Sequence, residues 1–414
     1  MSSVNELFTV VPPLEALEAL LRRGAPLDRT ENVALEAALG RVVASPIRAA
    51  ETLPAFARST MDGYAVRAAE TFGASEAAPA YLLLCGEVAM GRAAALTVPP
   101  LGAARIYTGA MLPAGADAVI MVEDTNAHGD EIELLSSVAP GENIVAAGED
   151  VRRGDLALDA GRRLRAQDVG GLAALGVTSL EVFARPRIAV LSTGDEVVPV
   201  AWTPGPGQVR DINATTVSAV IAAAGGEPVA CGIAPDDETA LLAATQAALA
   251  DADALVLSAG SSVSDRDLTA RVVERLGAPG IFVHGIAIKP GKPTLVAFAG
   301  TKPVIGLPGN PASALVLAWR LVAPLVRHLG GEAVDAGGVV CELDAVLAAP
   351  VRSRPGREDY VPCTLERTGD AVRAVPIFGK SNLIFTLIRA DGLIRIPLDR
   401  SGIAAGAAVR VIVP

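Results

Sequence analysis

Two lysines, Lys289 and Lys292, lie in the proline-framed segment IKPGKP between two runs of aliphatic residues. Pro290 and Pro293 restrict φ beside the lysines, and Gly291 lets the chain bend between them. Such a loop is either a tight turn with solvated ends or a rigid positive clamp for an anion. The whole chain carries a net charge of −11, so an anionic ligand would need local positive charge of this kind.

A second group of chemically useful residues follows another apolar run, in LSTGDE. Ser192, Thr193 and Gly194 offer hydroxyl and backbone N–H donors that can cradle a phosphate. The carboxylates of Asp195 and Glu196 can hold Mg²⁺ or its waters. The alternative is an ordinary polar turn at the end of a strand.

Two further loops have the same setting after an apolar run. Residues 258–267, SAGSSVSDRD, are mostly small, so a ligand could approach the backbone, and Asp265 or Asp267 could lie near a metal. The alternative is that Asp267 only caps the following helix. Residues 307–313, LPGNPAS, place Asn310 before a helix whose free N–H groups can bind an anion, or which is simply capped.

The elements that must position these loops alternate between strands and helices from residue 186 onward. This order predicts right-handed βαβ units and a doubly wound, mostly parallel sheet. Ligands bind beyond the carboxyl ends of such strands, where these loops fall. The strands are predicted at 187–192, 227–234 and 253–258, with further ones at IAI, TLVAF and VIGL, and the helices at 213–225, 236–252, 267–277 and 311–330.

The remaining chain predicts three other regions. Leucine spacing predicts a helix over 12–24, and a second helix is predicted over 30–40, with Thr30 as its N-cap. Short strand-like runs separated by turn residues predict an inserted β-rich region and a small C-terminal β-barrel. The predicted domains are a helical and irregular N-terminal domain (1–53 and 143–185), the β-rich insertion (54–142), the α/β domain (186–331) and the barrel (332–414).

The composition is that of a globular protein, with 51% hydrophobic and 20% charged residues. The negative charge disfavours binding to nucleic acid or an anionic membrane. The four cysteines lack CxxC spacing and are predicted to be buried thiols in a reducing compartment, and the three histidines are scattered, so no zinc site is expected. Without a signal-like segment or an unbroken apolar run of about 20 residues, a cytoplasmic protein is expected.

The motifs, taken in order, resemble the molybdopterin molybdenumtransferase family, which includes MoeA-type proteins and the gephyrin C-terminal domain. The resemblance covers nearly the whole chain. Individually, short turns such as GED are more often structural, and the ordered set is what identifies the family. The matching segments are STMDGYAV, RIYTGAMLP, GADAVIMVED, GENI, GEDV, RIAVLSTGDEVV, RDINAT, SAGSSVSDRD, IAIKPGKP and LPGNPAS.

The resemblance implies a molybdopterin-binding α/β domain and an elongated homodimer. It also implies a Mg²⁺-dependent reaction in which molybdate and adenylylated molybdopterin give molybdenum cofactor and AMP. The implied active site lies between the α/β domain of one subunit and the β-rich insertion of the other. Other cofactor-biosynthesis proteins and apo-molybdoenzymes are expected as further partners, whereas nucleic acid and membranes are not.

Carried over by position, the resemblance and the loop chemistry above give three sets of candidate site residues. The catalytic set is Asp62, Thr108, Asp150, Glu196, Asp236, Asp267, Lys289 and Lys292. The substrate-binding set is Ser192, Thr193, Gly194, Asp195, Ser258, Gly260, Ser261, Ser262, Pro308, Gly309, Asn310, Arg357 and Ser381. The Mg²⁺ ligands are expected to be Asp195, Glu196, Asp236 and Asp267.

The chain departs from the family pattern at three places. Residues 145–147, Val-Ala-Ala, stand where the family usually has an arginine before GED. His284 and Gly285 stand where the bacterial pattern often has a lysine shortly before IAIKPGKP, and SAGSSVS replaces SGGVSVG. These changes are compatible with a preference for tungstate, or with compensation by Arg105, Arg152 or Lys380.

Two other function classes compete with the enzyme. One is a binding or scaffold protein that keeps the cleft without activity, which the missing arginine would favour and the retained carboxylates oppose. The other is an α/β enzyme that only adenylylates or hydrolyses a pterin or nucleotide. The motifs around Asp62 and Thr108 argue against that reading.

Overall fold

The computed structural model describes residues 10–259, 263–333, 341–369 and 371–413, with only the backbone described for 263–267. The chain forms two compact units. The first contains the α/β domain and the C-terminal barrel, and the second contains the β-rich region. The first comprises Met1–Ala44, Gly161–Arg165 and Leu180–Pro414, and the second Ser45–Ala160 and Ala166–Ser179.

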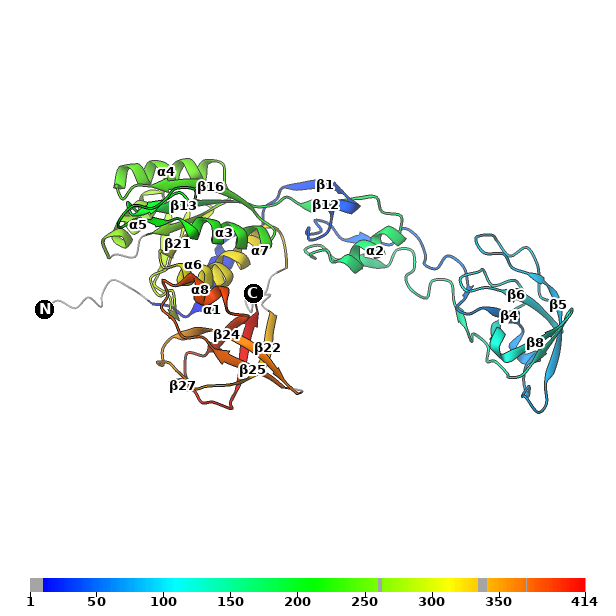
Figure 1. Ribbon diagram of the computed structural model, residues 1–414. Coiled ribbons are helices and arrows are strands. Elements are labelled where there is room, and N and C mark those ends of the chain that lie inside the picture. The colour runs from blue at the N-terminus through cyan, green and yellow to red at the C-terminus, as the bar shows by residue number, and fades with distance from the viewer. Residues whose placement is uncertain (1–9, 260–262, 334–340, 370, 414) are drawn as a thin grey trace. The chain divides into compact units, whose positions relative to one another are not determined.

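The α/β domain is built on a six-stranded sheet in the order β16-β13-β17-β21-β20-β18 (Figure 1). The pairings from β16 to β21 are parallel, whereas β20 and β18 add an antiparallel edge. The prediction of a mostly parallel sheet is therefore confirmed. The strands are β13 (Arg187–Thr193), β16 (Glu227–Ala234), β17 (Ala254–Ala259), β18 (Pro279–His284), β20 (Leu295–Ala299) and β21 (Lys302–Pro308).

Alternate residues of a central strand feed two separate cores. Ile188 and Val190 of β13 are buried in one core, and Ala189 and Leu191 are buried in the other. Successive side chains of a strand point to opposite faces, so the unbroken apolar run of β13 requires helices on both sides. One core takes α1 (Pro13–Arg23), α3 (Ile212–Ala223), α6 (Pro311–Leu317) and α7 (Ala323–Leu329), and the other takes α4 (Glu238–Ala250) and α5 (Val263–Arg275).

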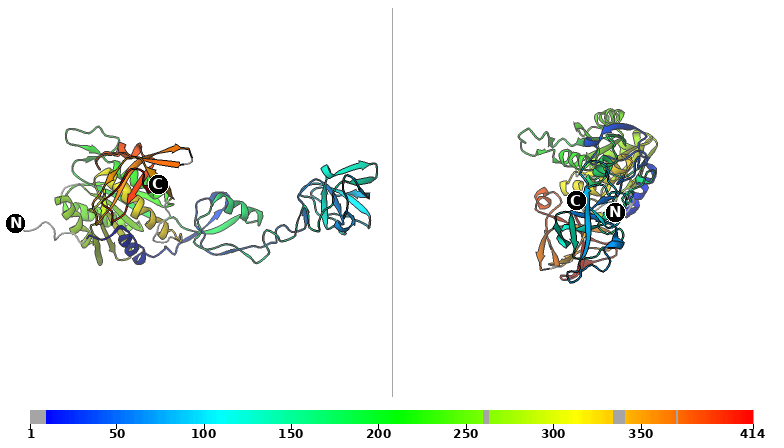
Figure 2. Two further views of the ribbon diagram at one scale, coloured as in Figure 1. Left: turned by 90° about the horizontal axis from the view of Figure 1, so that it is seen from below. Right: turned by 90° about the vertical axis from the view of Figure 1, so that its right-hand side faces the viewer.

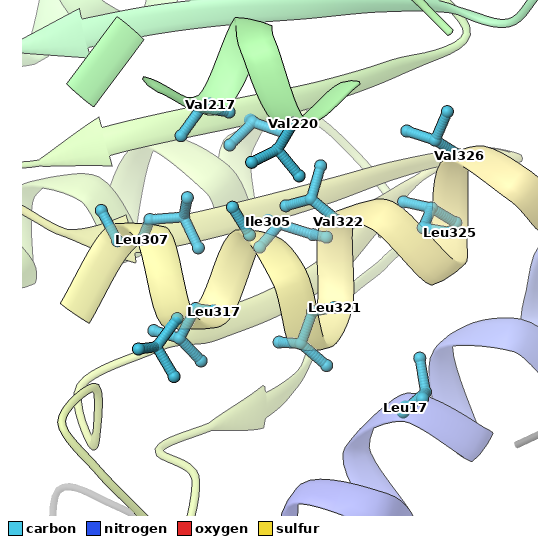
Figure 3. Packing of buried hydrophobic residues seen from close by; sticks show 14 of the residues in the cluster. Leu17, Val217, Val220, Ile305, Leu307, Leu317, Leu321, Val322, Leu325 and Val326 are labelled. Atoms are coloured by element: carbon cyan, nitrogen blue, oxygen red, sulfur yellow. The ribbon is translucent and has the colours of Figure 1, made fainter. Parts of the chain in front are cut away.

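The helix predicted over 311–330 is confirmed, but it is not α-helical throughout. A π-helical segment, Ala318–Val322, joins α6 to α7. Figure 3 shows Leu317, Leu321 and Leu325 of this helix packed among the buried residues of the core. The helix Pro311–Leu329 is long and apolar enough to span a membrane, yet 67% of its most apolar 18-residue stretch is buried inside the protein. This helix is therefore the central core helix of the α/β domain.

The two helices predicted near the N-terminus have different outcomes. The first is confirmed as α1, whose Leu17 and Leu20 are buried in the α/β core. The second is wrong, because Thr30–Ala34 is strand β1, which pairs with β12 (Ser179–Phe183). The Thr30 hydroxyl donates to Glu181 Oε1 (2.7 Å) instead of capping a helix. Pairing with a distant strand outweighs the modest helix propensity of this segment.

The C-terminal domain is a closed five-stranded barrel. Its strands run in the order β24-β25-β22-β28-β26, and β26 pairs back to β24. A short strand from the α/β domain, β19 (Ile288–Lys289), pairs in parallel with β24 and places Lys289 opposite Asp359. The strand predicted at IAI (286–288) thus contributes to the barrel sheet and not to the α/β sheet. The bounds are β22 (Cys341–Leu347), β24 (Glu358–Thr368), β25 (Ala371–Pro376), β26 (Gly392–Ile396) and β28 (Ala408–Val413). In Figures 1 and 2 this barrel lies beside the α/β domain.

The second unit contains a six-stranded sheet in the order β7-β4-β6-β5-β9-β8, together with helix α2 (Ala166–Ala174). Two buried clusters cover this sheet, one around Ile120 and Ile132 and the other around Ile106 and Val119. The strands are β4 (Gly63–Val66), β5 (Ala80–Glu87), β6 (Gly102–Ile106), β7 (Ala118–Met121), β8 (Thr125–His128) and β9 (Glu131–Leu134).

The four cysteines are free thiols. The prediction that all are buried is wrong, because Cys85 and Cys341 are exposed. Cys363 is buried in the barrel, and burial raises the pKa of its thiol to about 12. It therefore stays protonated and serves as a small core residue.

Candidate functional site

A cleft of about 920 Å³ lies between the α/β domain and the barrel of the first unit. Its volume matches that of pockets for organic molecules. Among the described residues that line it, Asp359 is the single carboxylate. The six lining cations are Lys289, Lys292, Arg352, Arg354, Arg357 and Lys380.

Hydrogen bonds and steric contact hold the IKPGKP loop in one shape. The Thr294 hydroxyl donates to the Gly291 carbonyl (2.7 Å), and the Lys292 carbonyl accepts from the N–H groups of Ile286 and Thr294 (2.9 Å each). Gly291 has φ +119°, and a Cβ there would lie 2.7 Å from Leu317 Cδ1. Only glycine fits this bend against the core helix. The loop is therefore rigid, and both lysine side chains are exposed at the cleft.

Arg357 is fixed by the carboxylate beside it. Its Nε donates to Asp359 Oδ1 (2.8 Å) and its Nη2 to Oδ2 (3.3 Å). Lys289 Nζ lies 3.8 Å from the same Oδ2. The structure thus gathers one cation from the barrel and one from the α/β domain around a single buried carboxylate.

The start of the core helix borders the same cleft. Pro308, Asn310 and Ser381 line it, as predicted for substrate-binding residues, although lining alone does not test that role. Asn310 is the N-cap but makes no capping hydrogen bond with its side chain. The Ala312 N–H donates to the Ser381 carbonyl (3.0 Å), so this N–H is not free for an anion. The prediction of a helix end with free N–H groups is wrong at that position, because the barrel uses it.

A second group lies at the carboxyl ends of β13 and β16. The Thr193 hydroxyl donates to Asp236 Oδ1 (2.8 Å), and the Asp195 N–H donates to Oδ2 (3.3 Å). The Asp236 N–H returns a bond to Asp195 Oδ1 (3.2 Å). These bonds join the loops after two neighbouring strands and place Asp195, Glu196 and Asp236 at one edge of the sheet.

The donors at this edge do not form an all-protein metal cage. No three His, Cys, Asp or Glu side chains in the described part of the chain lie close enough together to hold a metal. Asp267 is in the first turns of α5, and its side chain lies outside the described residues. Mg²⁺ usually binds one or two carboxylates and completes its shell with water and substrate phosphates. Asp195 and Glu196 fit that mode of binding.

Two buried polar atoms near these loops have no hydrogen-bond partner in the part of the chain that the structure describes. Asn213 of α3 donates from Nδ2 to Ser258 Oγ (2.8 Å) and to the Gly309 carbonyl (2.9 Å), which ties together two candidate loops. Its Oδ1 and the Ser192 hydroxyl have no hydrogen bond among the described residues. Each unsatisfied group costs about 1–3 kcal/mol, a cost that a polar ligand would remove. Gly260, Ser261 and Ser262 lie outside the described residues.

In the second unit, Asp62 and Thr108 meet at the ends of β4 and β6. Asp62 Oδ1 accepts from the Thr108 N–H (2.7 Å) and hydroxyl (2.9 Å). The backbone bond first, and then the hydroxyl bond, hold the pKa of the exposed Asp62 carboxyl below its ordinary value. Arg105 adds to this effect, and it donates to the Tyr64 hydroxyl (2.9 Å) while lying over that ring.

Asp150 and the Val-Ala-Ala segment also belong to the second unit. The Asp150 backbone N–H donates to the Leu53 carbonyl (3.1 Å), and its exposed side chain has no hydrogen bond within the described ranges. Val145 pairs with Arg58 in a two-stranded sheet. Of the three residues suggested as compensation, Lys380 lines the cleft, whereas Arg105 and Arg152 belong to the second unit.

Sequence reasoning missed several cleft residues. Arg352 and Arg354 line the cleft and were not among the candidates, although VRSRPGR has three arginines in seven residues. The close spacing of these arginines could have predicted a positively charged surface at this part of the chain. Asn213 was missed because its partners, Ser258 and Gly309, are distant in the sequence. Asp359 was missed because its role depends on contact with two residues that were themselves candidates, Arg357 and Lys289.

Family comparisons cover most of the chain. Residues 11–176 match the MoeA N-terminal region (domains I and II). Residues 189–328 match a probable molybdopterin binding domain, and residues 344–413 match the MoeA C-terminal region (domain IV). The fold and cleft therefore define a multidomain protein of the MoeA class.

Curated relatives and a solved structure agree with these matches. A molybdopterin molybdenumtransferase of Nostoc is 34% identical, covering 99% of this chain and 92% of its own. The Bacillus subtilis molybdopterin molybdenumtransferase is 32% identical over 92% of this chain and 89% of its own. The molybdopterin biosynthesis MoeA structure of Pyrococcus horikoshii OT3 has a TM-score of 0.85 at 30% identity, covering 98% of this chain and all of that one. The chain belongs to the molybdopterin molybdenumtransferase family, a family of transferases in molybdenum cofactor biosynthesis.

Proposed function

We propose that this protein inserts molybdate into adenylylated molybdopterin, with release of AMP and with Mg²⁺. The observation that carries the proposal is the cleft with six cations and one carboxylate in a chain of net charge −11. Molybdate is a dianion, and the other substrate carries a phosphoanhydride. Arginine and lysine bind such groups through charge-assisted hydrogen bonds.

The proposed roles divide between the two groups of the first unit. Lys289, Lys292 and Arg357 bind molybdate or substrate phosphate in the cleft. At the edge of the sheet, the hydroxyl of Ser192 and the amide oxygen of Asn213 bind polar groups of the pterin substrate, because neither has a hydrogen bond among the described residues. Mg²⁺, held by Asp195 and Glu196, would neutralise charge on the phosphoanhydride.

For the chemical step we propose that an oxygen of bound molybdate attacks the adenylyl phosphorus. The P–O bond to the molybdopterin phosphate breaks, and adenylyl molybdate forms. The two dithiolene thiols then displace two oxygens from molybdenum: one leaves in AMP, and the other leaves as water with the two thiol protons. Asp62, Thr108 and Asp150 keep the catalytic roles that the resemblance implies. Asp62→Asn should lower turnover, as expected for loss of a positioned acid–base group, while thermal unfolding changes little. Soaking with both substrates tests the geometry, and a molybdate site remote from Lys289 and Arg357 would contradict it.

The decisive experiment incubates the purified protein with adenylylated molybdopterin, Mg²⁺ and molybdate, and measures AMP and active cofactor. Both products are expected. No AMP would indicate a binding or scaffold protein, and AMP without cofactor would indicate a hydrolase. A parallel reaction with tungstate measures the metal preference.

The resemblance also leads us to propose a cytoplasmic homodimer. Light scattering of the purified protein tests the oligomeric state. A mass of 42.1 kDa at micromolar concentration, that of one chain, would refute the dimer.

A further inference from the structure

One buried carboxylate lies among the cations of the cleft, where an anion is expected to bind. Asp359 is 2% exposed, although it borders an open cleft. We infer that Asp359 is a positioning residue that joins Arg357 of the barrel and Lys289 of the α/β domain into one anion-binding group. This inference rests on the proposed function.

The contact with Arg357 fixes the direction of the guanidinium. Two donors, Nε and Nη2, bind the two oxygens of Asp359 at 2.8 and 3.3 Å. Such two-bond pairing is stronger and more directional than a single hydrogen bond. Nη1 has no partner among the described residues, so it remains available to an oxyanion in the cleft. Arg357 is 32% exposed, which leaves that edge accessible.

The same carboxylate connects the two domains. Lys289 of β19 lies opposite Asp359 of β24, and the Glu358 N–H donates to the Ala287 carbonyl (2.8 Å). Lys289 Nζ is 3.8 Å from Asp359 Oδ2 and 59% exposed. Two cations so placed would repel each other without the carboxylate. With it, they keep a net charge of +1 toward the cleft.

The neighbouring residue provides a matched control. Glu358 is 3% exposed and accepts hydrogen bonds from Arg395 Nη2 and the Tyr360 hydroxyl, both at 2.7 Å. Burial raises the pKa of the Tyr360 phenol, which therefore stays protonated and donates. Neighbouring residues of a strand face opposite sides, so the Glu358 side chain lies in the interior of the protein whereas Asp359 lines the cleft.

The test compares Asp359→Asn with Glu358→Gln. Calorimetry with molybdate alone measures the Kd, and steady-state assays measure KM and kcat. For Asp359→Asn we expect the Kd and KM for molybdate to rise roughly tenfold, as for loss of a charged hydrogen bond, with a smaller change in kcat. For Glu358→Gln we expect a lower Tm and an unchanged Kd. Asp359→Glu, which restores the charge, should recover part of the affinity.

The outcomes separate the inference from the function that it assumes. Equal Kd values for wild type and Asp359→Asn would overturn the positioning role. Absence of molybdate binding by the wild type would instead reject the proposed function. If Asp359→Asn does not fold, Asp359→Glu takes its place, because it keeps the charge but moves the carboxylate relative to Arg357. A smaller rise in Kd is then expected, and an unchanged Kd would overturn the inference.

Discussion

The cationic cleft and the Asp62–Thr108 turn hold charge in different ways. In the turn, one carboxylate accepts two hydrogen bonds from a single residue, Thr108, which follows the neighbouring strand β6. In the cleft, cations from residues 289–380 converge from a loop, a strand and the barrel. Four of these cations pair with no carboxylate among the described residues: Lys292, Arg352, Arg354 and Lys380. Local pairing is enough to build the turn, whereas the cleft requires two domains to pack. Changes in packing should therefore affect the cleft more than the turn.

The largest effect is expected from removing the anchored cation of the cleft. Arg357→Gln should lower kcat/KM for molybdate about 100-fold, because a charge-assisted contact to an anion is lost and Asp359 loses its two-bond partner. Arg410→Gln is the control, since Arg410 is exposed and pairs with Glu342 on the barrel. Steady-state kinetics measure the difference. Equal losses in both variants would mean that the cleft is not the anion site.

A change in packing behind the cleft should come next. Gly291→Ala forces φ +119° on alanine and brings Cβ to 2.7 Å from Leu317, so unfolding should become easier by about 2–4 kcal/mol. Molybdate affinity should fall with it. Gly300→Ala is the control, because that glycine has φ +62° and open space, and about 1 kcal/mol is expected. Chemical denaturation measures both, and equal losses would contradict the packing argument.

The turn is best tested by pH. The lowered pKa of Asp62 keeps its carboxylate charged at pH values where an ordinary aspartate takes up a proton. Thr108→Ala removes the hydroxyl donor, so this pKa should rise and the acidic limb of kcat should move to higher pH. Any stability that this hydrogen bond contributes is lost as pH falls through the folded pKa. Thr125→Ala, which removes a hydroxyl bonded to the Val122 carbonyl, is the control. A shift in the control alone would refute the assignment.

The smallest effect is expected at the exposed rim of the cleft. Replacing Arg352 and Arg354 by glutamine should lower kcat/KM for molybdate about threefold in dilute buffer. The difference should vanish in concentrated salt, because the screening length falls from about 10 Å at 0.1 M to about 3 Å at 1 M. The control replaces Arg367 and Arg373, exposed at another part of the barrel, with the same change in charge. A salt-independent loss would indicate direct contact instead of steering.

The sequence predicted an element of the fold correctly where the pattern depended on residues close together in the chain. The apolar run of β13 and the leucine spacing of α1 each allowed a single interpretation, and the structure confirms both. Thr30–Ala34 looked helical because its preference is weak and its partner, β12, is about 150 residues away in the chain. The domain boundaries and the roles of individual site residues remain predictions.

By itself, the sequence determined the family, the α/β and β domains, and the rigid positive loop, because each depends on residues close together in the chain. Only the tertiary structure decided which charges meet. It placed Arg352, Arg354 and Lys380 beside the IKPGKP loop and put Asp359 between Arg357 and Lys289. The physical reason is that electrostatic interaction depends on distance in space, and two domains had to pack before these side chains became neighbours.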